Sequence, residues 1–211
     1  VQRPSSAEAV THARLVVTAY AQHECCRKEP NMPVRETMAD LIERLRTLIA
    51  DKSGADQVFS DEDLQDFLDA HRVEHFYIPL TAVPTVAAGG GVTTTRFTSG
   101  ALHDWEEDAE LFGPDFERIE PAVSDWRRGI WTFEEDQPEP VRISGRTYDL
   151  FGSGADALEC WAAKIKVESD LKTGDFAFAR LPRVQAILSL AETLRRRQSP
   201  VTATIRRSDL C

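Results

Sequence analysis

The clearest pattern of apolar and polar positions lies between Glu36 and Ala50. Its apolar residues follow one another at intervals of one and three positions, which places them on a single face of an α-helix. Other positions, including those of Arg44 and Arg46, form the opposite, polar face. Asp51–Gly54 supplies polar and glycine residues that end such a helix, so the pattern predicts an amphipathic helix over this segment. The apolar residues are Met38, Leu41, Ile42, Leu45, Leu48 and Ile49.

A second helix is indicated by the residues at its N-terminus. Ser60 followed by Asp63 matches a capping box, in which each side chain accepts a hydrogen bond from a free backbone N–H. Phe59 before the cap and Leu64 within the helix match a hydrophobic staple. The acids Asp61–Asp63 lie where the helix dipole favours negative charge. A helix that begins after Ser60 is therefore predicted, and its apolar face consists of Leu64, Phe67, Leu68 and His71.

The pattern changes after His71 and becomes typical of short strands. Residues 76–147 contain clusters of β-branched and aromatic residues, interrupted by Pro, Gly and Asp. The strand candidates are 76–80, 93–98, 117–119, 129–133 and 141–144. Their pairing does not follow from the sequence, so we interpret the region as a small β-rich insertion between helices.

Helical periodicity returns at Tyr148 and again at Pro182, and Ser199-Pro200 ends the last helix. The first of these stretches has a stripe of Leu150, Ala155, Leu158, Trp161, Ala162 and Ile165. In the second, the residues expected to face inward are Val184, Ile187, Leu188, Ala191 and Leu194.

Together these elements predict a mainly α fold, a small helical bundle with an inserted β-rich sub-domain and an extended C-terminal tail. Convincing order begins only after Met32, which is a candidate natural start, so the preceding residues are interpreted as a weakly ordered or non-native extension. The predicted parts are the extension (1–31), the helical bundle (32–75 and 148–198), the acidic β-rich insertion (76–147) and the tail (199–211).

Charge is distributed unevenly along the chain. Residues 101–140 contain 13 acids and 3 arginines, which equals the whole formal net charge of −10. Residues 172–211 contain 8 basic and 3 acidic residues. This asymmetry is typical of a protein whose two ends meet different partners. Apolar runs are far shorter than the roughly 20 residues that span a bilayer, and residues 1–31 lack a secretory pattern, so we expect a soluble intracellular protein without a membrane partner.

Motifs for catalysis are missing from the sequence. GxSxG, a phosphate-binding loop and HExxH do not occur, and the four cysteines have no CxxC spacing. The acidic run His103–Asp108 is the best candidate for a Mg²⁺ site or for acid–base catalysis, but a solvated acidic loop is the favoured interpretation. We therefore expect no enzymatic activity, no catalytic residue, no metal and no cofactor.

Arginines and β-branched residues are concentrated near the C-terminus. The arginines suit nucleic-acid phosphates, but equally the negative end of a helix or an acidic protein surface. Aromatic residues are not interleaved with them, so base stacking is not indicated. The β-branched residues favour an extended strand that adds to the edge of a partner's sheet. The candidate partner-binding residues are Arg196, Arg197, Val201, Thr202, Thr204, Ile205, Arg206 and Arg207.

Three stretches, by their order and spacing, resemble the head–tail connector, or adaptor, proteins of long-tailed bacteriophages. They are the helical segment 38–49, the capped segment 57–69, and Tyr148–Gly152 leading into 155–164 and then 183–197. The likeness covers most of residues 38–80 and 129–207.

The resemblance implies a structural virion protein that is made in the bacterial cytoplasm and located at the head–tail interface. Copies would form a ring of twelve beneath the portal protein, and the C-terminal segment would enter the portal rim. The other face of the ring would receive a tail-side connector or stopper protein, and DNA would pass through the channel without sequence-specific binding. The alternative is a small helical DNA-associated or regulatory protein that uses its arginines.

Overall fold

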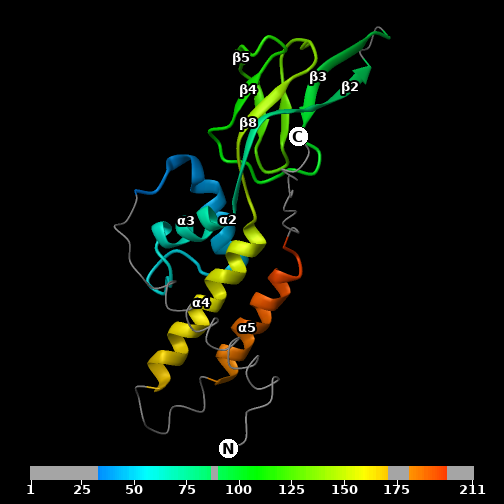
Figure 1. Cartoon of the computed structure of the whole chain (residues 1–211). Helices are drawn as coiled ribbons and strands as arrows, with labels where there is room; N and C mark the ends of the chain where they lie inside the picture. Colours follow the sequence, from blue (N-terminus) through cyan, green and yellow to red (C-terminus); the bar gives the residue numbers. More distant parts are fainter. Residues whose placement is uncertain (1–32, 87–89, 171–180, 199–211) are drawn as a thin grey trace, which may run out of the picture.

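The chain folds into a helical body and a β body that are joined end to end (Figure 1). The structure, a computed structural model, describes residues 33–86, 90–170 and 181–198. Two neighbouring strands, β1 (Arg72–Pro79) and β8 (Arg142–Tyr148), connect the two bodies. We call the region where these strands meet the helices the waist.

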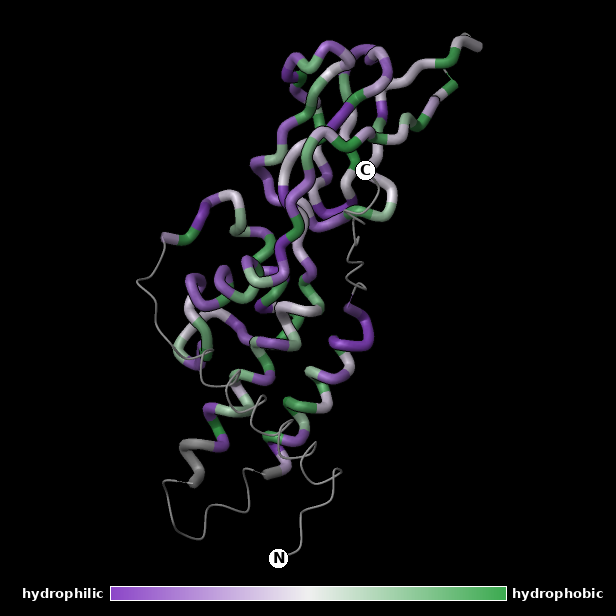
Figure 2. The backbone as a smooth tube through the Cα atoms, viewed as in Figure 1, coloured by the Kyte–Doolittle hydropathy of each residue, from purple (hydrophilic) through white to green (hydrophobic). Residues whose placement is uncertain are grey.

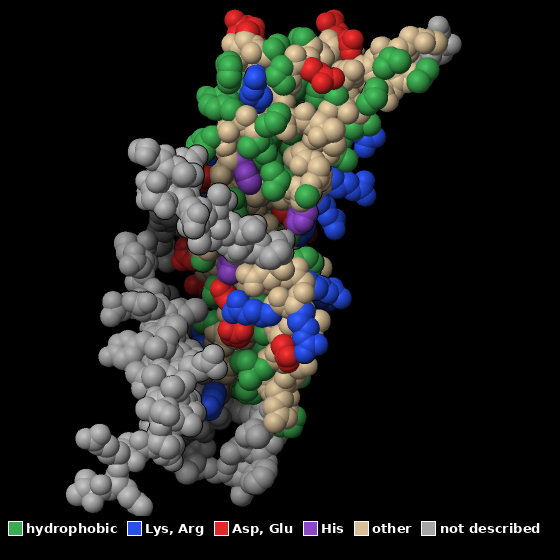
Figure 3. Space-filling view, turned by 45° about the vertical axis from the view of Figure 1, so that its right-hand side comes forward, with side chains coloured by type: hydrophobic (Ala, Val, Ile, Leu, Met, Phe, Trp, Pro, Cys, Tyr) green, Lys and Arg blue, Asp and Glu red, His purple; other side chains and the backbone are tan. Residues whose placement is uncertain are grey.

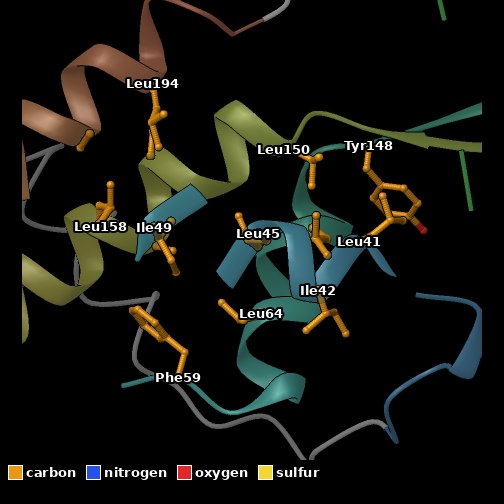
Figure 4. Packing of buried hydrophobic residues seen from close by; sticks show 14 of the residues in the cluster. Leu41, Ile42, Leu45, Ile49, Phe59, Leu64, Tyr148, Leu150, Leu158 and Leu194 are labelled. Atoms are coloured by element: carbon orange, nitrogen blue, oxygen red, sulfur yellow. The ribbon is translucent and has the colours of Figure 1, made fainter. Parts of the chain in front are cut away.

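Within the described residues, the helical body contains four α-helices whose apolar stripes meet in one core. A single 3-10 turn, η1 (Glu36–Met38), leads into α2 (Ala39–Ile49), and the other helices are α3 (Asp61–Ala70), α4 (Leu150–Asp170) and α5 (Leu181–Arg195). Helix α4 packs against α2 and α3, and α5 returns along α4 (Figure 1). Most predicted inward-facing residues are buried there, but Leu188 of α5 is 45% exposed. Residues at the centre of this core include Leu41, Leu45, Leu64, Leu158 and Leu194 (Figure 4).

One residue of the predicted polar face of α2 is buried instead of solvated. Arg46 is only 5% exposed. Its guanidinium donates hydrogen bonds to Asp51 at 3.0 Å, to Asp61 at 2.6 Å and to the carbonyl oxygen of Phe59 at 2.9 Å. Asp51 also accepts hydrogen bonds from the backbone N–H groups of Val58 and Phe59. This buried ion pair therefore fixes the loop that joins α2 to α3.

Both hydrogen bonds of the predicted capping box are present at the start of α3. The backbone N–H of Asp63 donates to Ser60 Oγ at 3.1 Å, and the backbone N–H of Ser60 donates to Asp63 Oδ2 at 3.0 Å. Phe59 and Leu64 are both buried in the helical core. The first turn of α3 is thus held to the core on its apolar side and capped on its polar side.

The β body consists of two four-stranded antiparallel sheets, ordered β1-β8-β4-β5 and β2-β3-β7-β6. Strand β1 leads through Leu80 directly into β2, so the chain passes from the first sheet into the second at one side of the body. Between the sheets lies a second core, which includes Phe97, Trp105, Leu111, Trp131 and Ile143. The remaining strands are β2 (Thr81–Val86), β3 (Val92–Thr98), β4 (Glu110–Phe112), β5 (Arg118–Ile119), β6 (Val123–Asp125) and β7 (Ile130–Thr132).

The prediction of a mainly α fold is wrong. Helices make up 37% of the structure and strands 27%, so the fold is mixed α/β. The region predicted as a β-rich insertion has its own core and pairs strands that lie far apart in the sequence, such as β1 with β8 (Arg72↔Tyr148). Local periodicity does not reveal pairing over such separations, and for this reason the amount of strand was underestimated.

Two predicted parts of the chain, the N-terminal extension (1–31) and the tail (199–211), lie outside the described residues.

Hydrophilic and hydrophobic residues alternate along the helices (Figure 2). None of the helices within the described ranges combines the length and the apolar character that crossing a lipid bilayer requires.

The capping box gives a direct test of this local structure. Replacing Ser60 by Ala removes the acceptor for the Asp63 N–H, so we expect the free energy of unfolding to fall by about 1 kcal/mol. Chemical denaturation followed by circular dichroism measures this change. Ser53→Ala, at an exposed position of the same loop, is the matched control and is expected to leave stability unchanged.

Candidate partner-binding surface

A buried carboxylate connects the two bodies at the waist. Glu106 is 0% exposed, and its Oε1 accepts hydrogen bonds from Arg35 Nε at 3.0 Å and from Thr37 Oγ1 at 2.6 Å. Its Oε2 accepts a hydrogen bond from the Tyr148 hydroxyl and lies 3.1 Å from Arg146 Nε. We call these five residues the waist clasp. Because they come from the helical body, the loop before β4 and strand β8, the clasp fixes the orientation of one body relative to the other.

Further ion pairs surround the clasp on the two bodies. Arg35 also forms an ion pair with Asp69 of α3 at 2.6 Å, and Arg146 pairs with Asp108. On the neighbouring face of α2, Arg44 pairs with Asp104. Of these three ion pairs, Arg44–Asp104 joins the two bodies, whereas each of the other two lies within one body and holds a clasp arginine in place.

The clasp keeps Glu106 ionised. Burial by itself opposes the charge, but hydrogen bonds from Thr37 and Tyr148 and the positive charges of Arg35 and Arg146 outweigh it, so the pKa of Glu106 lies below its ordinary value. Burial, together with the hydrogen bond to Glu106, raises the pKa of the Tyr148 hydroxyl. A carboxylate that is fully occupied by four donors is unsuited to act as a general base, so we interpret the clasp as structural.

The acidic run His103–Asp108 is only partly solvated, because His103, Glu107 and Asp108 are exposed and the other three residues are buried. Asp104 and Glu106 are buried and paired with arginines, and the intervening Trp105 belongs to the core of the β body. No three His, Cys, Asp or Glu side chains within the described ranges are grouped so as to hold a metal ion.

A shallow hollow of about 550 Å³ lies beside the clasp, between α2, the start of α4 and the loops of the β body. Its walls carry Asp40, Glu43 and Asp104, as well as Arg44 and Arg127. Arg44 pairs with Asp104 and lies 3.5 Å from Asp40. Since these charges largely compensate one another, the hollow does not select a strongly charged ligand.

An aromatic patch lies on the first sheet of the β body, and we define it as Tyr77, Phe112, Phe116 and Arg142. The ring centroid of Tyr77 lies 5.0 Å from that of Phe112 and 5.5 Å from that of Phe116. The Arg142 guanidinium lies 4.5 Å from the Phe116 centroid. Tyr77 has a φ of +50° at an irregularity in the β1–β8 register, and Phe76 beside it is 72% exposed. Exposed aromatic residues together with arginine are enriched at protein–protein interfaces.

The β2–β3 hairpin projects from the β body (Figure 1). The sequence from Thr81 to Thr95 contains no charged residue, and Val86 and Val92 are 75% and 67% exposed. Along this hairpin the hydropathy colours are pale or green (Figure 2). An uncharged, projecting ribbon of this kind is suited to contact another protein surface.

Acidic side chains gather at the end of the β body that lies farthest from the helices, which we call the distal acidic end (Figure 3). They belong to the loops after β4 and β7, next to Arg142 at the start of β8. The residues, all exposed, are Asp115, Glu117, Glu134, Glu135, Asp136 and Glu139. The acidic segment recognised in the sequence thus divides into a buried part at the waist and a solvated part at this end.

The arginines at the end of α5 are largely paired with acids of the same body. Arg195 bonds Asp156 and Glu159, and Arg196 lies 2.6 Å from Glu192. Burial opposes the charge of Asp156, but the hydrogen bond from His71 and the charge of Arg195 lower its pKa below the ordinary value.

The candidate residues Arg196 and Arg197 are both exposed. The remaining candidates, namely Val201, Thr202, Thr204, Ile205, Arg206 and Arg207, lie outside the described residues. The sequence interpretation did not find the aromatic patch or the waist clasp, because their members lie up to 113 positions apart in the chain, as with Arg35 and Tyr148. For the clasp, the one local signal was Trp105 within the acidic run, since Trp is highly buried on average and indicates that part of the run packs against a core.

No protein-family model, no curated protein and no solved structure matches this chain.

The waist clasp predicts a specific pH dependence of stability. Glu106→Gln removes the negative charge that forms ion pairs with both Arg35 and Arg146. Each of these arginine side chains is about one quarter exposed, so the pairs are only partly buried. We therefore expect the free energy of unfolding at pH 7 to fall by about 2–3 kcal/mol, below the range for completely buried pairs. Denaturant unfolding monitored by tryptophan fluorescence measures this loss.

The pKa of Glu106 is lower in the folded chain than in the unfolded chain. Ionised Glu106 therefore adds to the free energy of unfolding at any pH above the ordinary glutamate pKa of about 4.3, and this stabilisation is lost as the pH falls through the pKa of the folded chain. The difference between wild type and E106Q should therefore narrow below about pH 4. Glu107→Gln, at the exposed neighbouring position, serves as the control. A difference that stays constant down to pH 2 would contradict this role of the clasp.

Proposed function

We propose that the protein is a structural adaptor that joins the head of a tailed bacteriophage to its tail. Copies form a ring, of twelve members as in the family it resembles, beneath the portal protein. The C-terminal segment Val201–Cys211 attaches to the portal, and the opposite face of the ring receives a tail-side connector or stopper protein. Its location is then the head–tail interface of the virion, after assembly in the host cytoplasm.

The observation that carries this proposal is the separation of contact surfaces on one rigid, elongated molecule. The aromatic patch and the uncharged hairpin lie on the β body, whereas the chain leaves the described region at Gln198, at the waist. The waist clasp holds these surfaces in a fixed relation. An adaptor requires this geometry, because it must bind different partners at different places without changing the distance between them.

The distal acidic end supports the same proposal. Exposed carboxylates repel the phosphates of DNA, so a ring that presents this end toward its channel lets the genome pass without sticking. DNA is then a transient occupant of the channel and not a sequence-specific ligand.

The alternative of a DNA-associated regulatory protein is disfavoured by the ion pairs of α5. Two of the three consecutive arginines, Arg195 and Arg196, already contact carboxylates of the same helical body. Their charges are therefore largely compensated, whereas tight DNA binding requires several free cationic side chains along one surface. Duplex DNA binding that weakens steeply between low and physiological salt would favour the alternative.

The C-terminal segment provides the decisive experiment for portal attachment. Removing Val201–Cys211 leaves all described residues of both hydrophobic cores in the chain, so we expect it to remain folded by circular dichroism, with a melting temperature close to that of wild type. Electron microscopy of the chain mixed with the portal protein of the same phage should show decorated portals for the full chain and bare portals for the truncated chain.

A matched control retains the tail and changes an arginine elsewhere. Arg128→Gln alters an exposed arginine of the β body and is expected to decorate portals normally. Portals that the truncated chain still decorates would overturn the assignment of the tail as the portal-binding element.

A further inference from the structure

Strand β1 has an open edge of unusual length and exposure. It is the outermost strand of the first sheet, and within the described part of the chain only β8 pairs with it. Six of its eight residues are exposed, among them Val73 at 53% and Phe76 at 72%. An outer strand with exposed apolar side chains and free backbone N–H and C=O groups is a template for an added strand.

The other outer strands are shorter or blocked. Strand β5 has two residues and β6 has three. Strand β2 has Pro84 in its middle, where the ring removes a backbone donor and where the register with β3 shifts. Strand β1 also has a register shift, between His75 and Ile78, but it contains no proline before its last residue, Pro79, and is the longest of these outer strands, so it is the edge best suited to accept a strand.

The last described residue of the chain lies close to the first residues of this edge. A β-carbon added to Gly152 would lie 2.8 Å from His71 Nδ1 and 2.9 Å from Gln198 Nε2, so both side chains meet at Gly152. His71 directly precedes β1. The segment after Gln198 therefore starts at the waist end of β1, and an extended chain from there toward the distal end runs parallel to that strand.

The length and composition of the C-terminal segment match the edge. Val201–Arg207 has seven residues and β1 has eight, which at about 3.3 Å per residue correspond to about 23 and 26 Å. Val201, Ala203 and Ile205 alternate with polar residues, so an extended chain presents them on one side.

The charges of the segment and of the β body are complementary. A segment laid along β1 from Gln198 brings Arg206 and Arg207 to the distal acidic end, where Asp115 and Glu117 are exposed. Opposite charges at that end of the pairing stabilise it and fix its direction.

We propose that the open edge of β1 binds the C-terminal segment Val201–Arg207 of the same copy as an added parallel strand. The segment then covers Val73 and Phe76 until a partner takes it up. This intramolecular latch protects the edge from unwanted pairing and keeps the segment in one place. It does not depend on the proposed adaptor function, because it concerns the chain alone.

Hydrogen–deuterium exchange of the chain without any partner tests the latch. In the full chain, amides within Arg72–Pro79 should exchange at least tenfold more slowly than in a chain truncated after Pro200. The protection should be the same at low and high protein concentration, because the segment belongs to the same copy. Equal exchange in the two chains would overturn the latch, and protection that grows with concentration would assign the edge to a second copy.

A peptide of residues 199–211, with Cys211→Ser and a fluorescent label, tests the site independently. Fluorescence anisotropy should show saturable binding to the truncated chain and at least tenfold weaker binding to the full chain, whose own segment competes. In the truncated chain, Val73→Lys and Phe76→Ser should each weaken peptide binding at least tenfold.

Val123→Lys is the matched control, because Val123 is 63% exposed on β6 at the opposite edge of the β body. It should leave peptide binding unchanged. Binding that is insensitive to Val73→Lys and Phe76→Ser would place the peptide elsewhere and overturn the proposal. Since the portal is absent from these measurements, their failure and a failure of portal attachment are distinguishable.

Discussion

Glu106 is the group on which the arrangement of the two bodies depends. Burying a carboxylate without partners costs several kcal/mol, so the folded chain must bring Arg35, Thr37, Arg146 and Tyr148 to it. Together with Glu106, these residues come from three distant segments of the chain. The helical body and the β body therefore reach their final arrangement together, when the last of these segments is in place.

The polar character of this junction distinguishes it from the two cores. Each core is a separate cluster of apolar side chains, and residues of both clusters lie at the waist. Tyr148 places its ring in the helical core and its hydroxyl on Glu106, and Trp105 anchors the adjacent position in the β core. Hydrogen bonds are directional, whereas apolar contacts are not, so this junction defines an orientation as well as an attachment.

The sequence was informative wherever structure depends on neighbouring residues. The apolar stripe of α2 and the capping box at Ser60 are local patterns, and the structure contains both. The sheets were not derivable in the same way, because the pairing of β1 with β8 joins residues about 70 positions apart. The burial of charged residues was also missed. The sequence around Arg46 and Glu106 is typical of an exposed position, and each side chain is buried because it forms an ion pair with a residue of another segment.

The paired strands at the waist have a consequence for how this molecule can change over evolutionary time. The chain enters the β body at Arg72 and leaves it at Tyr148, and these two residues face each other across the sheet at about 5 Å. A module with adjoining ends can be lost, gained or exchanged by recombination at a single place in a gene while α3 and α4 stay where they are. The helical body would retain the trace of such an exchange in Arg35 Nε and the Thr37 hydroxyl, because both donate their hydrogen bonds to Glu106 of the exchanged module.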